Sequence, residues 1–172
     1  MDSVIAWAAN YLLWVMVVGV AAVWLFLEHR EGKLRLGLGA VVGLVVTLVL
    51  LFIAGKVHSD PRPFVQNPAL KPLIAHAADN GFPSDHSAAA GLIAALVMWR
   101  KLWYGLGFGV VAVLVAAARV AAHVHHVQDV IAGLAIGAIG ASVGALVAAW
   151  LLIRFGSRLR VGRLGRSVAD ES

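Results

Sequence analysis

The sequence predicts an all-α fold, a polytopic membrane helix bundle of about five transmembrane helices, from its composition and its apolar runs. Of its 172 residues, 61% are hydrophobic and only 13% are charged, whereas soluble domains carry about a quarter charged residues. The mean hydropathy of +0.88 describes the full length, so the apolar excess is not one local patch. This composition excludes a cytosolic enzyme, a nucleic-acid-binding protein and a disordered chain.

Five apolar runs predict the spanning helices. They cover residues 4–27, 36–55, 86–103, 102–118 with a continuation toward His123, and 130–153. As a helix, the first run rises about 36 Å, and the hydrocarbon core of a bilayer is about 30 Å thick. The third run is short, but Arg100 and Lys101 near its end can reach the interface with their long side chains. Residues 1–155 are therefore expected to form one membrane-embedded domain, followed by a basic cytoplasmic tail over residues 156–172.

Small residues recur in the last span, at steps of three and four residues: Gly133, Gly137, Gly140 and Gly144. Glycines at such spacing let helix backbones approach closely in lipid. We expect them to pack against other helices of the same chain. A dimer interface is the alternative, and the oligomeric state is left open.

Basic residues predict the orientation of the bundle. With five spans, ten Lys and Arg residues fall on one side of the membrane and four on the other, namely Lys56, Arg62, Lys71 and Arg119. Because cytoplasmic loops carry the excess of basic residues, the C-terminus is expected in the cytoplasm and the N-terminus outside. The arginine-rich tail is then a topology anchor near anionic lipid headgroups.

Histidines gather on the predicted outer side, where six of the seven lie: His58, His76, His86, His123, His125 and His126. Topology requires basic residues in the cytoplasm, but it does not require histidines outside. Ionisable residues at the ends of spans are candidates for function. Together with their polar neighbours, these residues form three clusters along the chain.

The first cluster runs from Lys56 to Phe64 and contains Pro61-Arg62-Pro63. A residue before a proline is disfavoured in the helical region, so Arg62 is expected to be extended and stiff. A guanidinium fork matches phosphate oxygens, and Lys56 adds a second positive charge. The simpler interpretation is a pair of interfacial basic residues that end a helix.

The second cluster precedes the third span and reads Pro83-Ser84-Asp85-His86. Ser84 or Asp85 can cap the helix, and the free backbone amides there can bind an anion. His86 would stand at that mouth and could give a proton to a leaving oxygen. A plain helix cap beside an interfacial histidine is the alternative.

The third cluster joins the last two spans and contains Arg119, His123, His125, His126 and Asp129. A carboxylate bonded to one imidazole nitrogen fixes the tautomer and makes the other nitrogen a better nucleophile. Asp129 can reach either His125 or His126, so spacing alone leaves this choice open. The histidines and Asp129 could instead hold a metal, but the nearby cations would repel a divalent ion and attract a phosphate.

Taken together, the three clusters resemble the signature of the type 2 phosphatidic-acid phosphatase superfamily, which reads K-x6-R-P, P-S-x-H and S-R-x5-H-x3-D. Pro83, Ser84 and His86 match the second motif, and the third is matched by Arg119, His125 and Asp129. The resemblance therefore selects His125 over its neighbours. The sequence departs from the pattern twice: five residues, not six, separate Lys56 from Arg62, and Ala118 stands where the family has serine.

The resemblance implies that residues 1–155 form a metal-independent lipid phosphatase domain with no cofactor and with its catalytic loops on the extracytoplasmic face. His125 would attack phosphorus and form a phosphohistidine, and Asp129 would orient it. His86 would protonate the leaving oxygen and then activate water. The phosphate would be held by four residues: Lys56, Arg62, Ser84 and Arg119. Asp85, whose charge would oppose a phosphate, is assigned to capping or to water.

Within the superfamily, the sequence looks most like bacterial undecaprenyl-diphosphatases, with phosphatidylglycerophosphate or phosphatidic acid as alternative substrates. The expected partners are a lipid phosphate or diphosphate and membrane lipids, with no nucleic acid. Three other classes of protein are alternatives: a vanadate haloperoxidase, a lipid-phosphate carrier without catalysis, and a histidine-based metal transporter. The full set of His86, Arg119, His125 and Asp129 favours an enzyme over a carrier, since binding alone would not require it.

Overall fold

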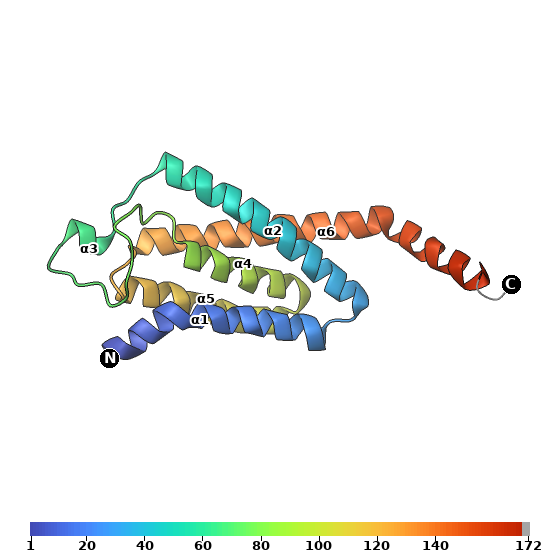
Figure 1. Cartoon of the computed structure of the whole chain (residues 1–172), viewed down its shortest axis with the longest axis horizontal. Coiled ribbons are helices and arrows are strands. Elements are labelled where there is room, and N and C mark those ends of the chain that lie inside the picture. Colours follow the sequence, from blue (N-terminus) through green and yellow to red (C-terminus); the bar gives the residue numbers. More distant parts are fainter. Residues whose placement is uncertain (170–172) are drawn as a thin grey trace.

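A computed structural model describes the backbone of residues 1–169 and the side chains of residues 1–155, and it confirms the all-α fold. Long helices run side by side in one bundle (Figure 1). They are α1 (Asp2–Ala22), which continues as the π-helical turn η1 (Val23–Leu27), α2 (Arg30–Val57), α4 (Asp85–Arg100), α5 (Leu102–Ala121) and α6 (Val127–Ala169). A short helix, α3 (Pro63–Gln66), lies in the loop after α2. The side chains of the predicted basic tail, 156–172, lie outside the described residues.

The helix ends differ from the predicted ones where local backbone geometry decides. The third helix was expected to run to Trp103, but α4 ends at Arg100 because Lys101 leaves the helical region with φ −144° and ψ 89°. Helix α5 then starts at Leu102. Helix α2 is longer than the predicted 36–55, because Arg30 to Arg35 already belong to it.

Within the described part of the chain, four helices are long and apolar enough to cross a membrane: Asp2–Leu27, Arg30–Val57, Leu102–Ala121 and Val127–Phe155. The third predicted span, α4, has only 16 residues, or about 24 Å of helix. It nevertheless connects the two ends of the bundle, because Arg100 at its C-terminus forms an ion pair with Glu28 beside η1 (Nη2–Oε2 3.0 Å). Helix α4 packs against α1, α2, α5 and α6, and its Ala88, Ala90 and Val97 are fully buried. Protein rather than lipid surrounds it, so it needs less length than the outer helices.

The glycines of α6 pack within the chain, as expected. A Cβ at Gly133 or Gly137 would clash with the α4 backbone at Ser84 or Ala88. Gly140 and Gly144 face α2 in the same way, and a Cβ there would strike Thr47 or the backbone at Gly39. Close backbone approach on two sides therefore places α6 between α4 and α2.

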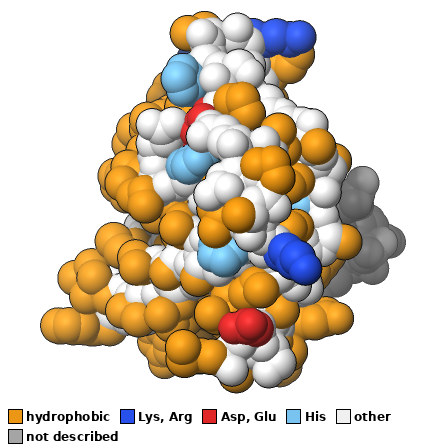
Figure 2. Space-filling model, turned by 90° about the vertical axis from the view of Figure 1, so that its left-hand side faces the viewer, with side chains coloured by type: hydrophobic (Ala, Val, Ile, Leu, Met, Phe, Trp, Pro, Cys, Tyr) orange, Lys and Arg blue, Asp and Glu red, His pale blue; other side chains and the backbone are white. Residues whose placement is uncertain are grey.

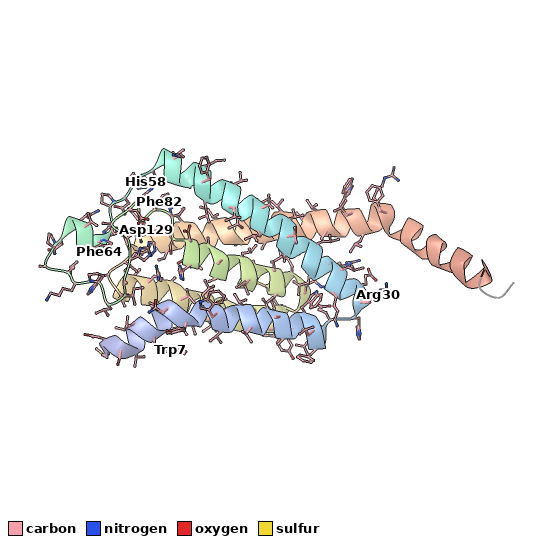
Figure 3. All side chains as sticks on the ribbon, viewed as in Figure 1. Trp7, Arg30, His58, Phe64, Phe82 and Asp129 are labelled. Carbon is pink, nitrogen blue, oxygen red and sulfur yellow. The ribbon has the colours of Figure 1, made fainter. Side chains whose placement is uncertain are left out.

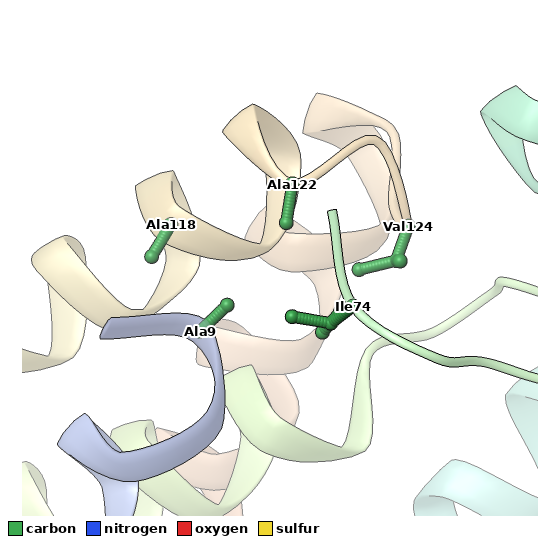
Figure 4. Close-up of a cluster of buried hydrophobic side chains, with 5 residues drawn as sticks. All are labelled: Ala9, Ile74, Ala118, Ala122 and Val124. Atoms are coloured by element: carbon green, nitrogen blue, oxygen red, sulfur yellow. The ribbon is translucent and has the colours of Figure 1, made fainter. Parts of the chain in front are cut away.

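Two loops, 58–84 and 122–126, close the end of the bundle where the N-terminus also lies (Figure 1). A buried apolar cluster fixes them to the helices. It joins Ile74 of the first loop and Val124 of the second to Ala9, Ala118 and Ala122 (Figure 4). The backbone bond from Leu73 N–H to the Ala122 carbonyl (3.1 Å) adds to this attachment.

Histidines and charged side chains are visible on this end face among white and orange surface (Figure 2). The side chains of His58, Phe64, Phe82 and Asp129 all lie at this end, whereas Arg30 lies at the far end of α2 (Figure 3). The three sequence clusters thus meet at one end of the bundle.

Candidate active site

A pocket of about 380 Å³ opens at the loop end of the bundle. Its cationic and imidazole lining comes from five residues of different segments: Arg62, His76, His86, Arg119 and His125. The other wall is apolar and consists of Leu51, Phe52, Phe82 and Pro83. The lining therefore combines cationic, imidazole and apolar side chains with the carboxylates of Asp79 and Asp85.

His125 is buried in this lining and is held at both ring nitrogens. Its Nδ1 lies 2.9 Å from the Gly81 carbonyl oxygen and 3.5 Å from Asp129 Oδ2. Both neighbours are acceptors, so Nδ1 carries the proton. Nε2 then keeps its lone pair, which faces Arg62 Nη1 at 3.3 Å. This tautomer leaves Nε2 as the nucleophilic nitrogen.

His126, the other histidine that spacing allowed, has different contacts. Its Nδ1 lies 2.8 Å from Asp60 Oδ2, and its side chain lines a second, shallower hollow with Asp60 and Gln128. Its backbone N–H donates to Asp129 Oδ2 at 2.8 Å, and its Nδ1 lies 3.9 Å from the same oxygen. The third histidine, His123, lies near the Lys71 carbonyl (Nδ1–O 3.1 Å).

Arg62 is extended, as the flanking prolines predict, with φ −60° and ψ 152°. Its buried guanidinium donates to Asp79 Oδ1 (2.8 Å) and to the Val124 carbonyl (2.8 Å). The hydrogen bond from Arg62 also lowers the pKa of the Asp79 carboxyl. These bonds fix the guanidinium against His125.

Arg119 is only 2% exposed, yet most of its donors are free. Nη1 donates to the Ala9 carbonyl (3.3 Å), while Nε and Nη2 have no partner among the described residues. A buried cation without a partner is unfavourable, since its lost hydration is not replaced. An anion in the pocket would supply the missing acceptors, so this guanidinium is the clearest sign of an anion site.

The second cluster forms the start of α4. Ser84 is the N-cap, and its Oγ accepts from Ser87 N–H at 3.4 Å. Ser84 is fully buried and does not line the pocket. His86 and Asp85 do line the pocket, but Asp85 is not the cap.

Lys56 is the other predicted phosphate ligand that the structure leaves outside the pocket. It is exposed, and its Nζ lies over the Phe52 ring, 5.6 Å from the centroid. Helix α2 continues to Val57, so Lys56 remains on the helix instead of joining the loop that carries Arg62.

Sequence patterns did not predict a role for Asn80, which holds the loop at the pocket together. Its Oδ1 accepts from the backbone N–H groups of Asp60 (2.9 Å) and Phe82 (3.0 Å), and its Nδ2 donates to the carbonyls of Gly55 and His58 (both 3.2 Å). His76 and Asp79 of the same loop also line the pocket and were missed. The Asp79-Asn80-Gly81 turn sequence was the only available signal.

The alternative prediction of a metal site concerns a group of acidic and histidine side chains beside the pocket. Asp60, His126 and Asp129 place possible ligand atoms within 4.8 Å of one another, whereas His123 is not in this group. Protein donors already contact Asp60, since the side-chain amides of Gln66 (3.0 Å) and Gln128 (2.6 Å) donate to it. The carboxylate of Asp60 therefore has its acceptors engaged without a metal.

Apolar helices long enough to span a membrane, with an arginine- and histidine-lined pocket at one end of the bundle, define the class as an integral membrane protein. The chain belongs to the PAP2 superfamily, whose sequence pattern matches residues 34–153. It is thus a member of a phosphatase family and a multi-pass membrane protein.

Curated relatives agree with this assignment. The chain is 35% identical over 127 residues to the putative undecaprenyl-diphosphatase YbjG of Escherichia coli. This match covers 73% of this chain and 64% of YbjG, so the chain spans less than two thirds of the length of YbjG. It is 33% identical over 142 residues to the bacitracin transport permease protein BcrC of Bacillus licheniformis, covering 82% and 68%. It is 28% identical over 162 residues to the undecaprenyl-diphosphatase BcrC of Bacillus subtilis, covering 93% and 77%.

The fold is similar to that of a solved structure, LpxE of Aquifex aeolicus. The TM-score is 0.61 at 23% identity, and the match covers 83% of this chain and 82% of that one. This likeness supports the arrangement of helices.

Arg119 is buried at the loop end and Arg100 is half-buried at the opposite end, and we expect their replacement to have opposite effects on stability. Arg119→Met removes an unpaired buried cation whose free donors each cost about 1–3 kcal/mol, so we expect an unchanged or higher melting temperature in detergent without phosphate. Inorganic phosphate should raise the melting temperature of the parent protein but not that of Arg119→Met.

The matched control is Arg100→Met, which leaves the carboxylate of buried Glu28 without its partner and should lower the melting temperature. An Arg119→Met protein that is less stable than the parent and still stabilised by phosphate would contradict the anion site.

Proposed function

We propose that the protein is a metal-independent lipid diphosphatase that removes the terminal phosphate of undecaprenyl diphosphate through a phosphohistidine. The observation that carries the proposal is the arrangement around His125. Its unprotonated Nε2 lies 3.3 Å from Nη1 of buried Arg62, in a pocket shared with Arg119, which has unpaired donors. A nucleophile beside two guanidinium groups suits attack on a phosphate, because catalysis of phosphoryl transfer depends mainly on positioning and charge stabilisation.

In the first step, Nε2 of His125 forms a bond to the terminal phosphorus, and the bond from phosphorus to the bridging oxygen breaks. The lipid monophosphate leaves and its oxygen takes a proton from His86, whose imidazole is protonated when the negative charge of the bound diphosphate lies beside it. Arg62 and Arg119 balance the negative charge that develops on the phosphoryl oxygens. In the second step, His86 takes a proton from water, the hydroxide attacks phosphorus, and inorganic phosphate departs as His125 is freed.

Asp129 and Gly81 act on the other side of the imidazole. The positive charge that forms on His125 during attack is stabilised by the buried Asp129 carboxylate 3.5 Å from Nδ1. The Gly81 carbonyl accepts a hydrogen bond from the Nδ1–H group and thereby fixes the ring. Asp129 therefore stabilises the charge on His125, and Asp129 and Gly81 together orient its ring.

A long lipid tail is supported by the apolar wall of the pocket. Phe52 lines the pocket and is also 67% exposed on the outside of α2, where lipid would surround the helix. A polyprenyl chain can therefore remain in the membrane while its headgroup reaches His125. The similarity to relatives named undecaprenyl-diphosphatase in E. coli (putative) and B. subtilis favours undecaprenyl diphosphate over the phosphoglycerolipids.

The site is proposed to face outward. The loop end holds the pocket, while the opposite end holds Arg30, Lys33, Arg35, Arg100 and Lys101. The positive-inside rule assigns that basic end to the cytoplasm. The spent carrier of wall synthesis is exposed on the outer side, where such an enzyme would meet it.

Steady-state kinetics of histidine variants test the proposed chemistry. With undecaprenyl diphosphate in detergent, His125→Ala should fall to background, and His86→Ala should lose about 10²–10⁴ in kcat. The His86→Ala loss should be smaller for an aryl phosphate, whose leaving group needs no proton. Asp129→Asn should lose much of its kcat with little change in KM, while His123→Ala should be mild.

Two controls accompany these assays. His126→Ala should stay active, because the side chain of His126 lies outside the pocket, and a chelator should not change the rate. An inactive His126→Ala with an active His125→Ala would refute the assigned nucleophile. Loss of activity with chelator would require a metal mechanism instead.

Cysteine labelling tests the orientation, since the chain has no native cysteine. Val65→Cys lies at the loop end, where Val65 is 41% exposed, and should react with an impermeant thiol reagent in intact cells. Ser157→Cys, in the basic tail, should react only after the cells are opened. The reverse pattern would place the pocket in the cytoplasm.

A further inference from the structure

His76 lines the active-site pocket but has no role in the chemistry described above. It lies in the loop before α4, and its ring meets the His125 ring edge to face, with centroids 6.0 Å apart. Its Nδ1 is shielded from solvent and makes no well-formed hydrogen bond to a described residue. Because the ring lines the pocket beside His125, it is in a position to contact a ligand bound there.

We propose that His76 is a substrate-phosphate ligand that becomes protonated when phosphate binds beside His125. This inference rests on the proposed function and adds a residue to its binding site. It differs from the predicted ligands Lys56 and Ser84, which do not line the pocket, and it gives the polar wall a donor besides the two guanidinium groups.

The charges around His76 explain why protonation would follow binding. Burial lowers the pKa of His76, the guanidinium groups of Arg62 and Arg119 lower it further, and a backbone contact at Ala77 offsets part of this shift. The imidazole is therefore neutral at pH 7 without a ligand. The other titratable groups facing the pocket are Asp79 of the same loop, Asp85 and His86 of α4, and His125 of the loop before α6.

A phosphate dianion in the pocket would reverse the sign of this field. It would compensate both guanidinium groups and add negative charge near His76, so the pKa of His76 would rise on binding. By linkage, a ligand that raises a pKa binds with proton uptake and binds more tightly at lower pH. Affinity should thus fall as pH rises through the pKa of His76 in the complex.

Calorimetry with inorganic phosphate tests this coupling on the full chain in detergent. Titrations near pH 7 in buffers of different ionisation enthalpy give the number of protons taken up per phosphate. The parent protein should take up more protons than His76→Gln, by as much as one per phosphate. His76→Gln should also bind phosphate about tenfold more weakly, as expected for the loss of one charged hydrogen bond.

His58→Gln is the matched control. His58 lies at the same end of the bundle, where its ring packs on Phe82 with centroids 4.6 Å apart, but it does not line the pocket. Its variant should match the parent in both proton uptake and affinity. Because phosphate itself titrates near pH 7, the difference between His76→Gln and His58→Gln isolates the contribution of His76.

Kinetics separate this inference from the proposed function. With undecaprenyl diphosphate, His76→Gln should raise KM more than it lowers kcat, and its KM should depend less on pH than that of the parent. If the parent hydrolyses the lipid but His76→Gln equals it in affinity and proton uptake, the role of His76 is refuted and the function stands. If the parent binds phosphate with the His76 signature yet hydrolyses no lipid phosphate, the proposed function fails instead.

Discussion

A buried guanidinium without an anionic partner dominates the loop end of this bundle. Arg119 donates once, to the Ala9 carbonyl, and its remaining donors are unpaired among the described residues. Such an arrangement lowers stability, and proteins retain it mainly where function requires it. Its neighbours in the pocket are held by other protein groups. Asp79 and the Val124 carbonyl fix Arg62, and the Gly81 carbonyl fixes His125. The pocket between them is suited to a phosphate.

The opposite end of the bundle shows how the same chain treats a cation with a structural role. There Arg100 forms two hydrogen bonds to the buried Glu28 carboxylate, at 3.2 and 3.0 Å. This pair joins the end of α4 to the turn between η1 and α2 and leaves no acceptor missing. Because α4 is held in this way and packed by glycines of α6, its N-terminus presents His86 at a fixed place in the pocket.

Sequence patterns predicted the fold and much of the site, because long apolar runs and short polar motifs are local signals. Arg62, His86, Arg119 and His125 were all predicted, and all line the pocket. The sequence could not separate His125 from His126 by spacing, since that depends on which ring meets Gly81 and which meets Asp60. Lys56 was also predicted, but it does not line the pocket, because helix α2 continues past it. His76 and Asn80 were missed because a loop without periodicity gives no sign of which side chains turn inward.

Trapping the covalent intermediate tests the central claim that the pocket uses His125 to take phosphate from a lipid diphosphate. The protein would be mixed with undecaprenyl diphosphate carrying a radioactive terminal phosphate, quenched within milliseconds in alkaline denaturant, and digested for peptide mapping. The account predicts an acid-labile, alkali-stable label on the imidazole of His125, enriched in His86→Ala. A label on another residue, or turnover with no label at any quench time in either protein, would contradict it.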